Sequence, residues 1–314
     1  MKILVTGGAG FIGSHLVDAL VARGDEVIVV DHYQREKLRY PNPAATTYKC
    51  DFRDPAVGDI LANERPDAVC HLAAQISVTH SIAHPIADAR RNIIDALHFL
   101  DLAHRAGVRK FVFSSSGGAI YGDHPVRPTP LLHDTFPNTP YGVSKQMFEH
   151  YLAQYWEQYG LPYVSLRFAN VYGPRQQAAR QGDEGNVISV FLHRMLDGRP
   201  VIIYGDGTAS RDYVFVHDAV DAFVRALSTG YVGPVNISTG KETSVRALYD
   251  VLVGIHGDPH PLSHEPYRHG ETVRSVLSYD SAKTHLDWEP MTSLEDGLKA
   301  TYDWFMETFR GRGT

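Results

Sequence analysis

Residues 1–20 read MKILVTGGAGFIGSHLVDAL, and this stretch decides the fold. A short apolar run before the first glycine is typical of a buried strand, and the pattern from Phe11 onward is typical of a helix. Between them, Gly7, Gly10 and Gly13 are spaced three apart. Glycine at such positions permits a tight turn, a close approach of the backbone to a ligand, and close packing of the helix on the strand. The helix N-terminus would direct its free N–H groups and its positive dipole end at a pyrophosphate, which predicts dinucleotide binding.

The alternation of strand and helix continues to about Phe168. Apolar runs such as EVIVVD and KFVFSSS are separated by helical stretches such as NIIDALHFLDLAHRAG, which ends at Gly107 as a helix with a glycine cap does. Continuous apolar strands that alternate with helices predict a parallel sheet covered on both faces, the doubly wound α/β architecture. Farther along, RDYVFVHDAVDAFVRAL, at residues 211–227, resembles another strand that returns to this sheet, followed by a helix.

Composition excludes several classes of function. The 314 residues carry a formal net charge of −6, which disfavours nonspecific binding to nucleic acid or acidic membranes. No apolar run is long enough to span a bilayer, and Met1 leads directly into a strand without the basic segment of a signal peptide. The 17 histidines form neither the HExxH spacing nor a Cys/His cluster, so we expect no metal site. We therefore expect a cytoplasmic protein.

Asp31 ends the second apolar run, close to the spacing of about 20 residues that places an acidic side chain beside a cofactor ribose. Its carboxylate can accept hydrogen bonds from both ribose hydroxyls and would repel a 2′-phosphate, so NAD is predicted in preference to NADP. His32, Arg35 and Lys37 lie nearby and leave NADP open. We expect residues 1–169 and 212–238 to form the NAD-binding domain. Residues 170–211 and 239–314 would form a smaller mixed α/β lobe that binds substrate over the carboxyl edge of the sheet.

Two further motifs carry chemistry: SSSGGAIYG at residues 114–122 and PYGVSK at residues 140–145. Tyr141 and Lys145 are four apart, so they share one face of a helix. A tyrosine with its ordinary pKa of about 10 is a poor base at neutral pH. A neighbouring lysine ammonium and the positive nicotinamide ring of NAD stabilise the phenolate. Ser116 ends the fifth strand and could relay a substrate proton, so the combination predicts alcohol–ketone chemistry on NAD.

These motifs resemble those of the extended short-chain dehydrogenase/reductases, and within them the nucleotide-sugar epimerases that act on UDP-glucose and UDP-galactose. The resemblance extends over nearly the whole chain and is carried by TGGAGFIG, HLAAQ, SSSGGAIYG, PYGVSK, LRFANVYGPRQ, YGDGTASRDYVFVHD and RHGE. It implies a Rossmann fold, an NAD cofactor, a UDP-sugar substrate and a homodimer. The implied reaction inverts C4 of the sugar through a transient 4-keto sugar.

The resemblance also implies roles for single positions. The catalytic set is Ser116, Tyr141 and Lys145. The cofactor positions are Gly7, Gly10, Phe11, Ile12, Gly13, Asp31, Asp51, Phe52, Leu72, Ala73, Ala74, Gln75, Asn92, Ser114, Tyr141 and Lys145. The substrate positions are Ser116, Tyr141, Asn170, Asn186, Val187, Arg211, Tyr213, Arg268 and Glu271. Guanidinium groups such as the two in this set are fixed forks that suit a diphosphate.

The identity of the catalytic serine and of the sugar stays open. The segment between the serines and Tyr121 is longer than in many relatives, so the serine could be Ser115, although the spacing to Tyr141 favours Ser116. Ser275 falls where some relatives carry a bulky aromatic residue. A small residue there leaves room for an N-acetyl group, so UDP-N-acetylhexosamines are possible substrates, and UDP-glucuronate is a further alternative.

Other reactions on the same fold are disfavoured. Dehydratases and decarboxylases carry an acidic residue after the serine, where this chain has Gly117 and Gly118. A net reductase that exchanges NADP(H) is disfavoured by Asp31. A non-catalytic protein that senses dinucleotides usually loses part of the catalytic set, which this chain keeps. 

For the implied homodimer, apolar residues outside the face of each helix that contacts the sheet would pair with those of a second copy. The candidates are Phe99, Phe148, Tyr151 and Tyr155. The alternative is that these residues are intrachain core.

Overall fold

The structure is a computed structural model. It describes residues 1–32, 40–123, 125–176, 187–266 and 273–310. Some positions singled out from the sequence lie outside the described residues: Arg35, Lys37, Asn186, Arg268 and Glu271.

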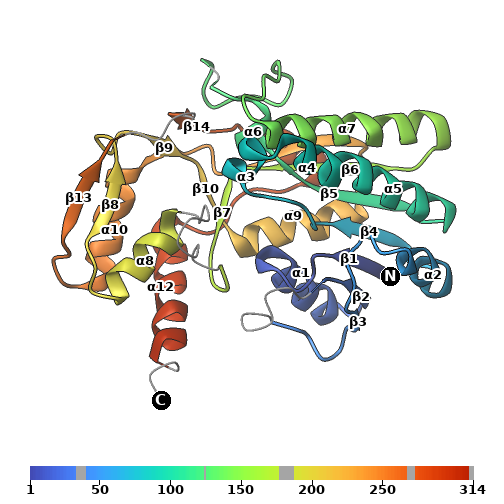
Figure 1. The fold of residues 1–314 in the computed structure, drawn as a ribbon, viewed down its shortest axis with the longest axis horizontal. Coiled ribbons are helices and arrows are strands. Elements are labelled where there is room, and N and C mark those ends of the chain that lie inside the picture. Colours follow the sequence, from blue (N-terminus) through green and yellow to red (C-terminus); the bar gives the residue numbers. More distant parts are fainter. Residues whose placement is uncertain (33–39, 124, 177–186, 267–272, 311–314) are drawn as a thin grey trace.

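A central sheet of seven parallel strands organises the molecule (Figure 1). The strand order is β11-β6-β5-β4-β1-β2-β3. The bounds are β1 (Lys2–Thr6), β2 (Glu26–Val30), β3 (Thr46–Tyr48), β4 (Ala68–His71), β5 (Lys110–Ser116), β6 (Tyr163–Phe168) and β11 (Gly233–Ile237). The chain reverses its direction of progress between β1 and β4, and open α/β sheets bind ligands at such a point. The predicted doubly wound fold is confirmed.

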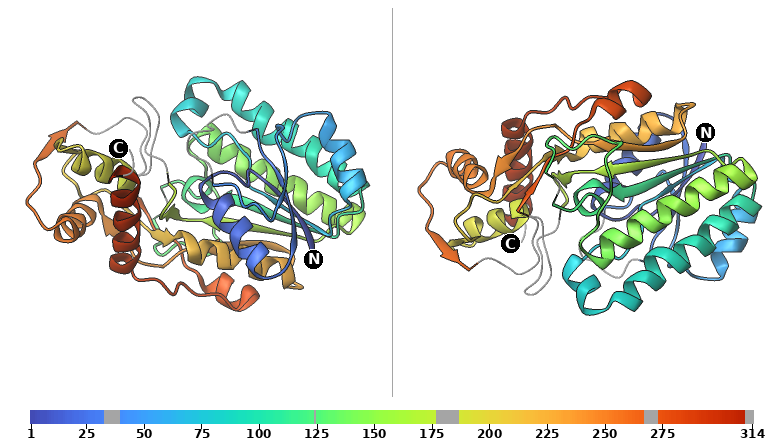
Figure 2. Two further views of the ribbon diagram at one scale, coloured as in Figure 1. Left: turned by 90° about the horizontal axis from the view of Figure 1, so that it is seen from below. Right: turned by 90° about the horizontal axis from the view of Figure 1, so that it is seen from above.

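Helices cover both faces of this sheet (Figure 2). The first layer contains α1 (Phe11–Ala22), α9 (Val216–Ser228) and α11 (Asp280–Leu286), and the second contains α2 (Ala56–Glu64), α5 (Ala96–Arg105) and α7 (Pro140–Tyr159). Successive residues of β1 alternate between the two cores: Ile3 and Val5 pack in the first, and Leu4 packs in the second. Because both faces of the strand are covered, its three central residues, Ile3 to Val5, are all apolar.

One strand assignment from the sequence is wrong. The strand expected to return to the central sheet is β10 (Tyr213–Phe215), which instead pairs in parallel with β7 (Asn170–Tyr172) in a separate two-stranded sheet. The seventh strand of the central sheet is β11, which pairs with β6. The chain leaves the sheet at Ala169, between β6 and β7. The resulting short pair lies beyond the carboxyl end of β6.

The C-terminal part forms a smaller lobe, on the left in Figure 1. Its helices are α8 (Val187–Leu196), α10 (Val245–His256) and α12 (Leu294–Arg310). Its strands are β8 (Val201–Tyr204), β9 (Ser210–Arg211), β12 (Thr243–Ser244), β13 (Leu262–Glu265) and β14 (Arg274–Ser275). These elements, together with β7 and β10, enclose a third apolar core. The domain boundaries given above stay a prediction.

The helix expected from Asn92 onward begins earlier and is irregular. After α3 (Val78–Ala83), helix α4 (Pro85–Ala89) starts with proline at its first position, which suits the fixed φ of that residue. A π-helical segment, η2 (Arg90–Asp95), then joins α4 to α5. Such widened turns occur frequently at functional sites.

Two residues proposed for a subunit interface lie in the core of the chain. The side chains of Phe99 and Phe148 are fully buried against the second face of the sheet. Of the four candidates, only the two others on α7 remain for a partner: Tyr151 is exposed and Tyr155 is partly buried. The expectation for Phe99 and Phe148 is therefore corrected.

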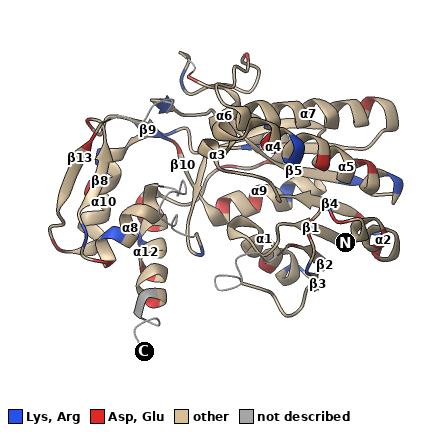
Figure 3. Ribbon diagram, in the orientation of Figure 1, with Lys and Arg blue, Asp and Glu red and all other residues tan. Residues whose placement is uncertain are grey.

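Charge is distributed over both lobes. Figure 3 shows Lys and Arg positions interspersed with Asp and Glu positions along the elements. No helix in the described part of the chain is long and apolar enough to cross a membrane. Among the same residues, no group of three or more His, Cys, Asp or Glu side chains is arranged to hold a metal ion.

Candidate active site

The glycine turn after β1 is packed so closely that side chains are excluded from it. The Gly10 amide donates to the Gly7 carbonyl oxygen at 3.0 Å, and Gly7 has a φ of +72°, in the left-handed region. A Cβ atom added to Gly13 would lie 2.1 Å from the same carbonyl oxygen. Helix α1 therefore starts directly against the end of β1. Its N-cap residue is Gly10, so no side chain accepts a hydrogen bond from the first N–H groups of the helix. The first turn of α1 is thus available to a phosphate group.

Asp31 lies beside this turn. Its residue is buried, and one carboxylate oxygen accepts a hydrogen bond from the Ala9 amide at 3.1 Å. The glycine turn and the carboxylate thus form one continuous surface from the end of β1 to the end of β2. A pyrophosphate next to an adenosine ribose fits this donor and acceptor set, so the residues present suit NAD.

A buried hydroxyl orients the segment that follows β4. Thr6 accepts hydrogen bonds from the amides of Leu72 and Ala73, both at 3.2 Å, and lies 2.8 Å from Nδ1 of His71. Because the lone pairs of Thr6 face two donors, its own proton points to Nδ1, which places the imidazole proton on Nε2. Burial lowers the pKa of His71 to about 3, so the ring stays neutral. The predicted cofactor positions 72–75 are fixed from beneath.

Asn92 holds the end of the same segment. Its amide group donates to the Gln75 carbonyl at 2.8 Å and to Asp88 at 3.0 Å, and its oxygen accepts from the Gln75 amide at 2.9 Å. Both N–H donors of Asn92 are therefore used within the chain. Asn92 was predicted to lie on the cofactor side, and the structure shows it supporting Gln75.

Asp51 and Phe52, predicted beside the adenine, differ in their surroundings. Asp51 pairs with Arg53 at 2.9 Å and with Arg91 at 3.3 Å, and these contacts outweigh burial to lower its pKa. The ring of Phe52 packs in the core, 5.1 Å from the ring of His71. Any contact between Phe52 and a cofactor would therefore be made by the Phe52 backbone and not by its ring.

Ser116, Tyr141 and Lys145 come together where β5 meets α7. Ser116 ends β5 immediately before the short helix α6 (Gly117–Ile120), and Tyr141 and Lys145 lie on the first turns of α7. The Lys145 ammonium donates to the Ser114 carbonyl oxygen at 2.8 Å and lies 5.7 Å from the centre of the Tyr141 ring. The chain carries these three groups on two elements packed against one another, as the spacing predicted.

Burial governs the proton affinities of this pair. It raises the pKa of Tyr141 to about 12, and a hydrogen bond with Ser116 opposes the increase. It lowers the pKa of Lys145 to about 8, and the nearby charges of Asp88 and Glu149 oppose the decrease. A cationic ring beside Tyr141 would favour the phenolate, so the site is arranged for a base that becomes active when a positively charged cofactor binds.

The two serines of β5 meet different residues of α7. Ser115 is buried and donates to Glu149 at 2.5 Å. Glu149 accepts hydrogen bonds from Arg167 in a buried ion pair: Arg167 Nε donates to Oε1 at 3.2 Å and to Oε2 at 3.1 Å, and Nη2 donates to Oε2 at 2.7 Å. Ser116, in contrast, is within hydrogen-bonding reach of Tyr141. The geometry thus favours Ser116 over Ser115 for contact with a substrate.

Two of the predicted substrate positions, Asn170 and Tyr213, lie on the short strand pair β7–β10. Asn170 on β7 is in register with Tyr213 on β10. A Cβ atom built on Gly118 would lie 3.8 Å from both the Asn170 side-chain oxygen and the Ser275 hydroxyl. The hydroxyl of Tyr213 is buried without a hydrogen-bond partner in the described part of the chain, which leaves a donor for a ligand. Polar groups of Asn170 and Ser275, from two separate segments, thus lie close to Gly118.

Arg211 and Val187 lie at the border of the smaller lobe. Arg211 is on β9, and its guanidinium donates to the Ser210 carbonyl at 2.8 Å and to the Val273 carbonyl at 3.3 Å. Val187 is the first residue of α8 and is partly buried. 

Sequence reasoning missed several buried residues around the site. Glu149 and Arg167 form the ion pair behind Ser115, and Asp88 is fully buried beside Asn92. The spacing of Asp88 and Asn92, four apart, is a signal that they share a helix face. No local pattern showed that this face meets the catalytic helix.

The chain matches a protein-family model over most of its length. The model of the NAD dependent epimerase/dehydratase family matches residues 3–238. The match begins at β1 and ends just after β11, so it spans the glycine turn, the serines and the Tyr141–Lys145 pair.

Individual relatives agree with the family model. UDP-glucose 4-epimerase of Mycolicibacterium smegmatis is 40% identical over 311 residues, covering 97% of this chain and 98% of the relative. The crystal structure of UDP-glucose 4-epimerase with UDP-glucose from Thermotoga maritima has a TM-score of 0.93 and 45% identity, covering 98% of this chain and all of that chain. UDP-N-acetylglucosamine 4-epimerase of Methanobrevibacter ruminantium has a TM-score of 0.91 and 33% identity, covering 98% of each.

Proposed function

Because the chain belongs to the NAD dependent epimerase/dehydratase family, we propose that it is an isomerase, a 4-epimerase that interconverts UDP-glucose and UDP-galactose. The observation that carries this proposal is the meeting of Ser116, Tyr141 and Lys145 beside a glycine turn built for a dinucleotide. The cofactor is NAD, held by the first turn of α1 and by Asp31. When bound, NAD takes the hydride from C4 of the sugar and later returns it, so no external oxidant is consumed.

The residues of the chain handle the proton and the alignment. The Tyr141 phenolate accepts the proton of the sugar 4-hydroxyl while the C4–H bond breaks, which leaves a 4-keto sugar. Ser116 holds the same oxygen by a hydrogen bond, and the Lys145 ammonium stabilises the phenolate. In the second half, Tyr141 gives its proton back to the oxygen at C4. Inversion requires that the sugar present its opposite face for the return of hydride.

The sugar must therefore turn while the nucleotide stays bound. Arg211 and the buried Tyr213 hydroxyl, together with Arg268 and Glu271 outside the described residues, are proposed to hold the UDP portion. Asn170 and Ser275 face the space around Gly118, where the sugar would turn. Small side chains around this space permit the rotation.

Epimerisation is better supported than dehydration or decarboxylation. A Cβ atom on Gly117 would lie 2.4 Å from a Leu277 methyl group, so the packing leaves no room for an acid at that position. Gly118 has space but also carries no acid. At these two positions the chain therefore offers no carboxylate to promote elimination from the 4-keto sugar, which favours return of the hydride.

The sugar specificity is tested by incubating purified protein, without added cofactor, with UDP-galactose, UDP-N-acetylgalactosamine and UDP-galacturonate in parallel. Chromatography should show conversion of UDP-galactose to UDP-glucose, because bound NAD is regenerated at each turnover. Conversion of the N-acetylated sugar is also expected, since Ser275 leaves space. If no sugar is converted even with NAD supplied, the proposed function is wrong.

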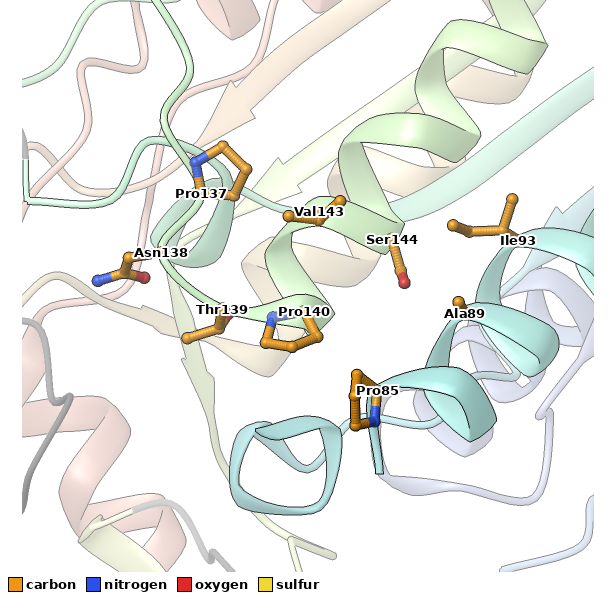
Figure 4. Close-up of a pocket in the computed structure, with 9 residues that line it drawn as sticks. All are labelled: Pro85, Ala89, Ile93, Pro137, Asn138, Thr139, Pro140, Val143 and Ser144. Atoms are coloured by element: carbon orange, nitrogen blue, oxygen red, sulfur yellow. The ribbon is translucent and has the colours of Figure 1, made fainter. Parts of the chain in front are cut away.

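We also propose that the chain forms a homodimer through α4, η2 and α7. All three elements carry exposed apolar residues. Ile86 on α4 is 80% exposed and Ile94 on η2 is 61% exposed, and Met147 and Tyr151 are exposed on α7. Between the helices is an apolar hollow of about 480 Å³, lined by residues such as Ala89 and Val143 (Figure 4). Exposed apolar residues gathered on one surface mark protein–protein contacts, and a two-fold axis through this surface would bury it in both copies.

Light scattering after size-exclusion chromatography should give twice the monomer mass of 34.9 kDa. Tyr151→Glu would place a charge in the interface and should shift the mass to that of a monomer. Leu132→Glu, at an exposed loop residue, is the matched control and should leave the mass unchanged. A monomer at all concentrations in the unaltered chain would exclude this dimer.

The two cysteines, Cys50 and Cys70, are both free thiols. Thiols persist in a reducing compartment, so the two free cysteines support the expectation of a cytoplasmic protein.

A further inference from the structure

Asp88 on α4 is a fully buried carboxylate. The reaction described above gives it no role. None of its surface is accessible to solvent. No ion pair in the described part of the chain includes it. Burial of an isolated carboxylate is costly unless hydrogen bonds and a nearby cation compensate for the lost hydration. The residues that compensate for Asp88 should therefore show what it does.

Three side chains donate to Asp88. One of its oxygens accepts from Gln75 Nε2 at 2.9 Å and from Asn92 Nδ2 at 3.0 Å, and the other accepts from the Ser144 hydroxyl at 2.6 Å. The amide orientations are fixed by their other contacts, because the Gln75 oxygen accepts from the Ser77 amide. A set made up of donors matches the ionised form of the carboxylate.

These partners lie on two parts of the site. Gln75 belongs to the segment after β4 that is predicted to lie under the cofactor, and Asn92, on η2, binds both backbone groups of Gln75. Ser144 is on α7, directly before Lys145. Figure 4 shows the Ser144 side chain projecting from α7 toward the helix that carries Ala89 and Ile93. Asp88 therefore joins the cofactor segment to the catalytic helix.

The charge of Asp88 also acts on the catalytic pair. It raises the pKa of Lys145 against the effect of burial, and it adds to the effect of burial on Tyr141. Other titratable groups surround these residues. They are Glu149 on α7, His71 at the end of β4, the exposed His80 on α3, and Arg91 on η2, which pairs with Asp51.

We propose that Asp88 is a positioning residue that holds α7 in register with the cofactor segment and, through its buried negative charge, keeps Lys145 in its ammonium form. This inference rests on the proposed function for the roles of Lys145 and Tyr141. Widening of the helix at η2, which begins five residues after Pro85, allows Asp88 and Asn92 to face the same segment.

Two variants separate the charge from the hydrogen bond. Asp88→Asn removes the charge and keeps the shape, and it lowers the proton affinity of both Tyr141 and Lys145. Activity requires the phenolate and the ammonium, so both the acidic and the basic limbs of the kcat profile should move to lower pH by about one unit. Ser144→Ala keeps the charge and removes the tie to α7. It should reduce kcat roughly tenfold with both limbs unmoved and KM little changed.

The control is Asp250→Asn, at an exposed carboxylate on α10, which should leave the pH profile as in the unaltered enzyme. Unmoved limbs in Asp88→Asn would overturn the electrostatic role, and an unaltered kcat in Ser144→Ala would overturn the positioning role. If Asp88→Asn does not fold, the Ser144→Ala result decides the positioning role, and Asp88→Glu, which keeps the charge, should retain the unaltered limbs.

A measurement without turnover distinguishes this inference from the proposed function. With lysine labelled by carbon-13 at Cε, the NMR signal of Lys145 can be assigned by its loss in Lys145→Met. The pKa of Lys145 should be about 8 in the unaltered chain and about one unit lower in Asp88→Asn. If the unaltered chain converts no UDP-sugar, the proposed function fails. The role of Asp88 is contradicted by a different result, namely a Lys145 pKa that is the same in Asp88→Asn as in the unaltered chain.

Discussion

Tyr141→Phe should reduce kcat for UDP-galactose by roughly 10²–10⁴-fold while the protein remains folded and retains its NAD. The phenol oxygen is the only atom lost, and it is the proposed acceptor of the 4-hydroxyl proton. General-base catalysis contributes about this factor. The ring of Tyr141 remains, so packing between α7 and the rest of the site is preserved. The measurement is initial-rate kinetics together with the NAD content of the purified variant.

The control is Tyr302→Phe, on α12 in the smaller lobe, which loses a hydrogen bond with His256 and should keep full activity. An unchanged kcat in Tyr141→Phe would mean that another group accepts the proton. If cells that depend on this protein grow equally well with Tyr141→Phe, the alternative of a non-catalytic dinucleotide sensor is favoured.

Arg167→Met should destabilise the chain by about 3–5 kcal/mol, because it leaves the Glu149 carboxylate buried without its cation. In the folded chain, Arg167 also donates to the Tyr121 hydroxyl at 2.8 Å, and Tyr121 donates to Asn236 at 2.9 Å. The pair thus connects α7 to β6, α6 and β11. Thermal unfolding should show Tm lowered by roughly 5–10 °C.

The double variant Glu149→Leu with Arg167→Met distinguishes the charge from the packing. Removing both charges avoids an uncompensated buried ion, so the double variant should be more stable than Arg167→Met alone. Arg246→Met, which breaks the exposed pair with Asp250, is the matched control and should cost less than about 1 kcal/mol. The single variant Glu149→Leu completes the comparison. If the double variant loses as much stability as the two single variants added together, no coupling exists between Glu149 and Arg167.

The pattern of strands and helices is readable from the sequence because it depends on neighbours in the chain. An apolar run such as residues 3–5 has the same meaning wherever it is found, namely a strand with both faces covered. The glycine turn is equally local, since Gly13 is excluded from carrying a side chain by Gly7 of the same turn. Likewise, Tyr141 and Lys145 share a face because a helix turns every 3.6 residues.

The sequence by itself therefore determined the doubly wound fold, the dinucleotide turn and the catalytic spacing. Tertiary structure alone decided that Phe99 and Phe148 lie in the core and that β10 pairs with β7 outside the central sheet. It alone joined Asp88 to Ser144, 56 positions apart. Periodicity shows that a face is apolar or that two residues are near, but it does not show which distant element covers that face. That choice is made by packing over the whole chain, where burial of apolar area and satisfaction of buried polar groups are settled together.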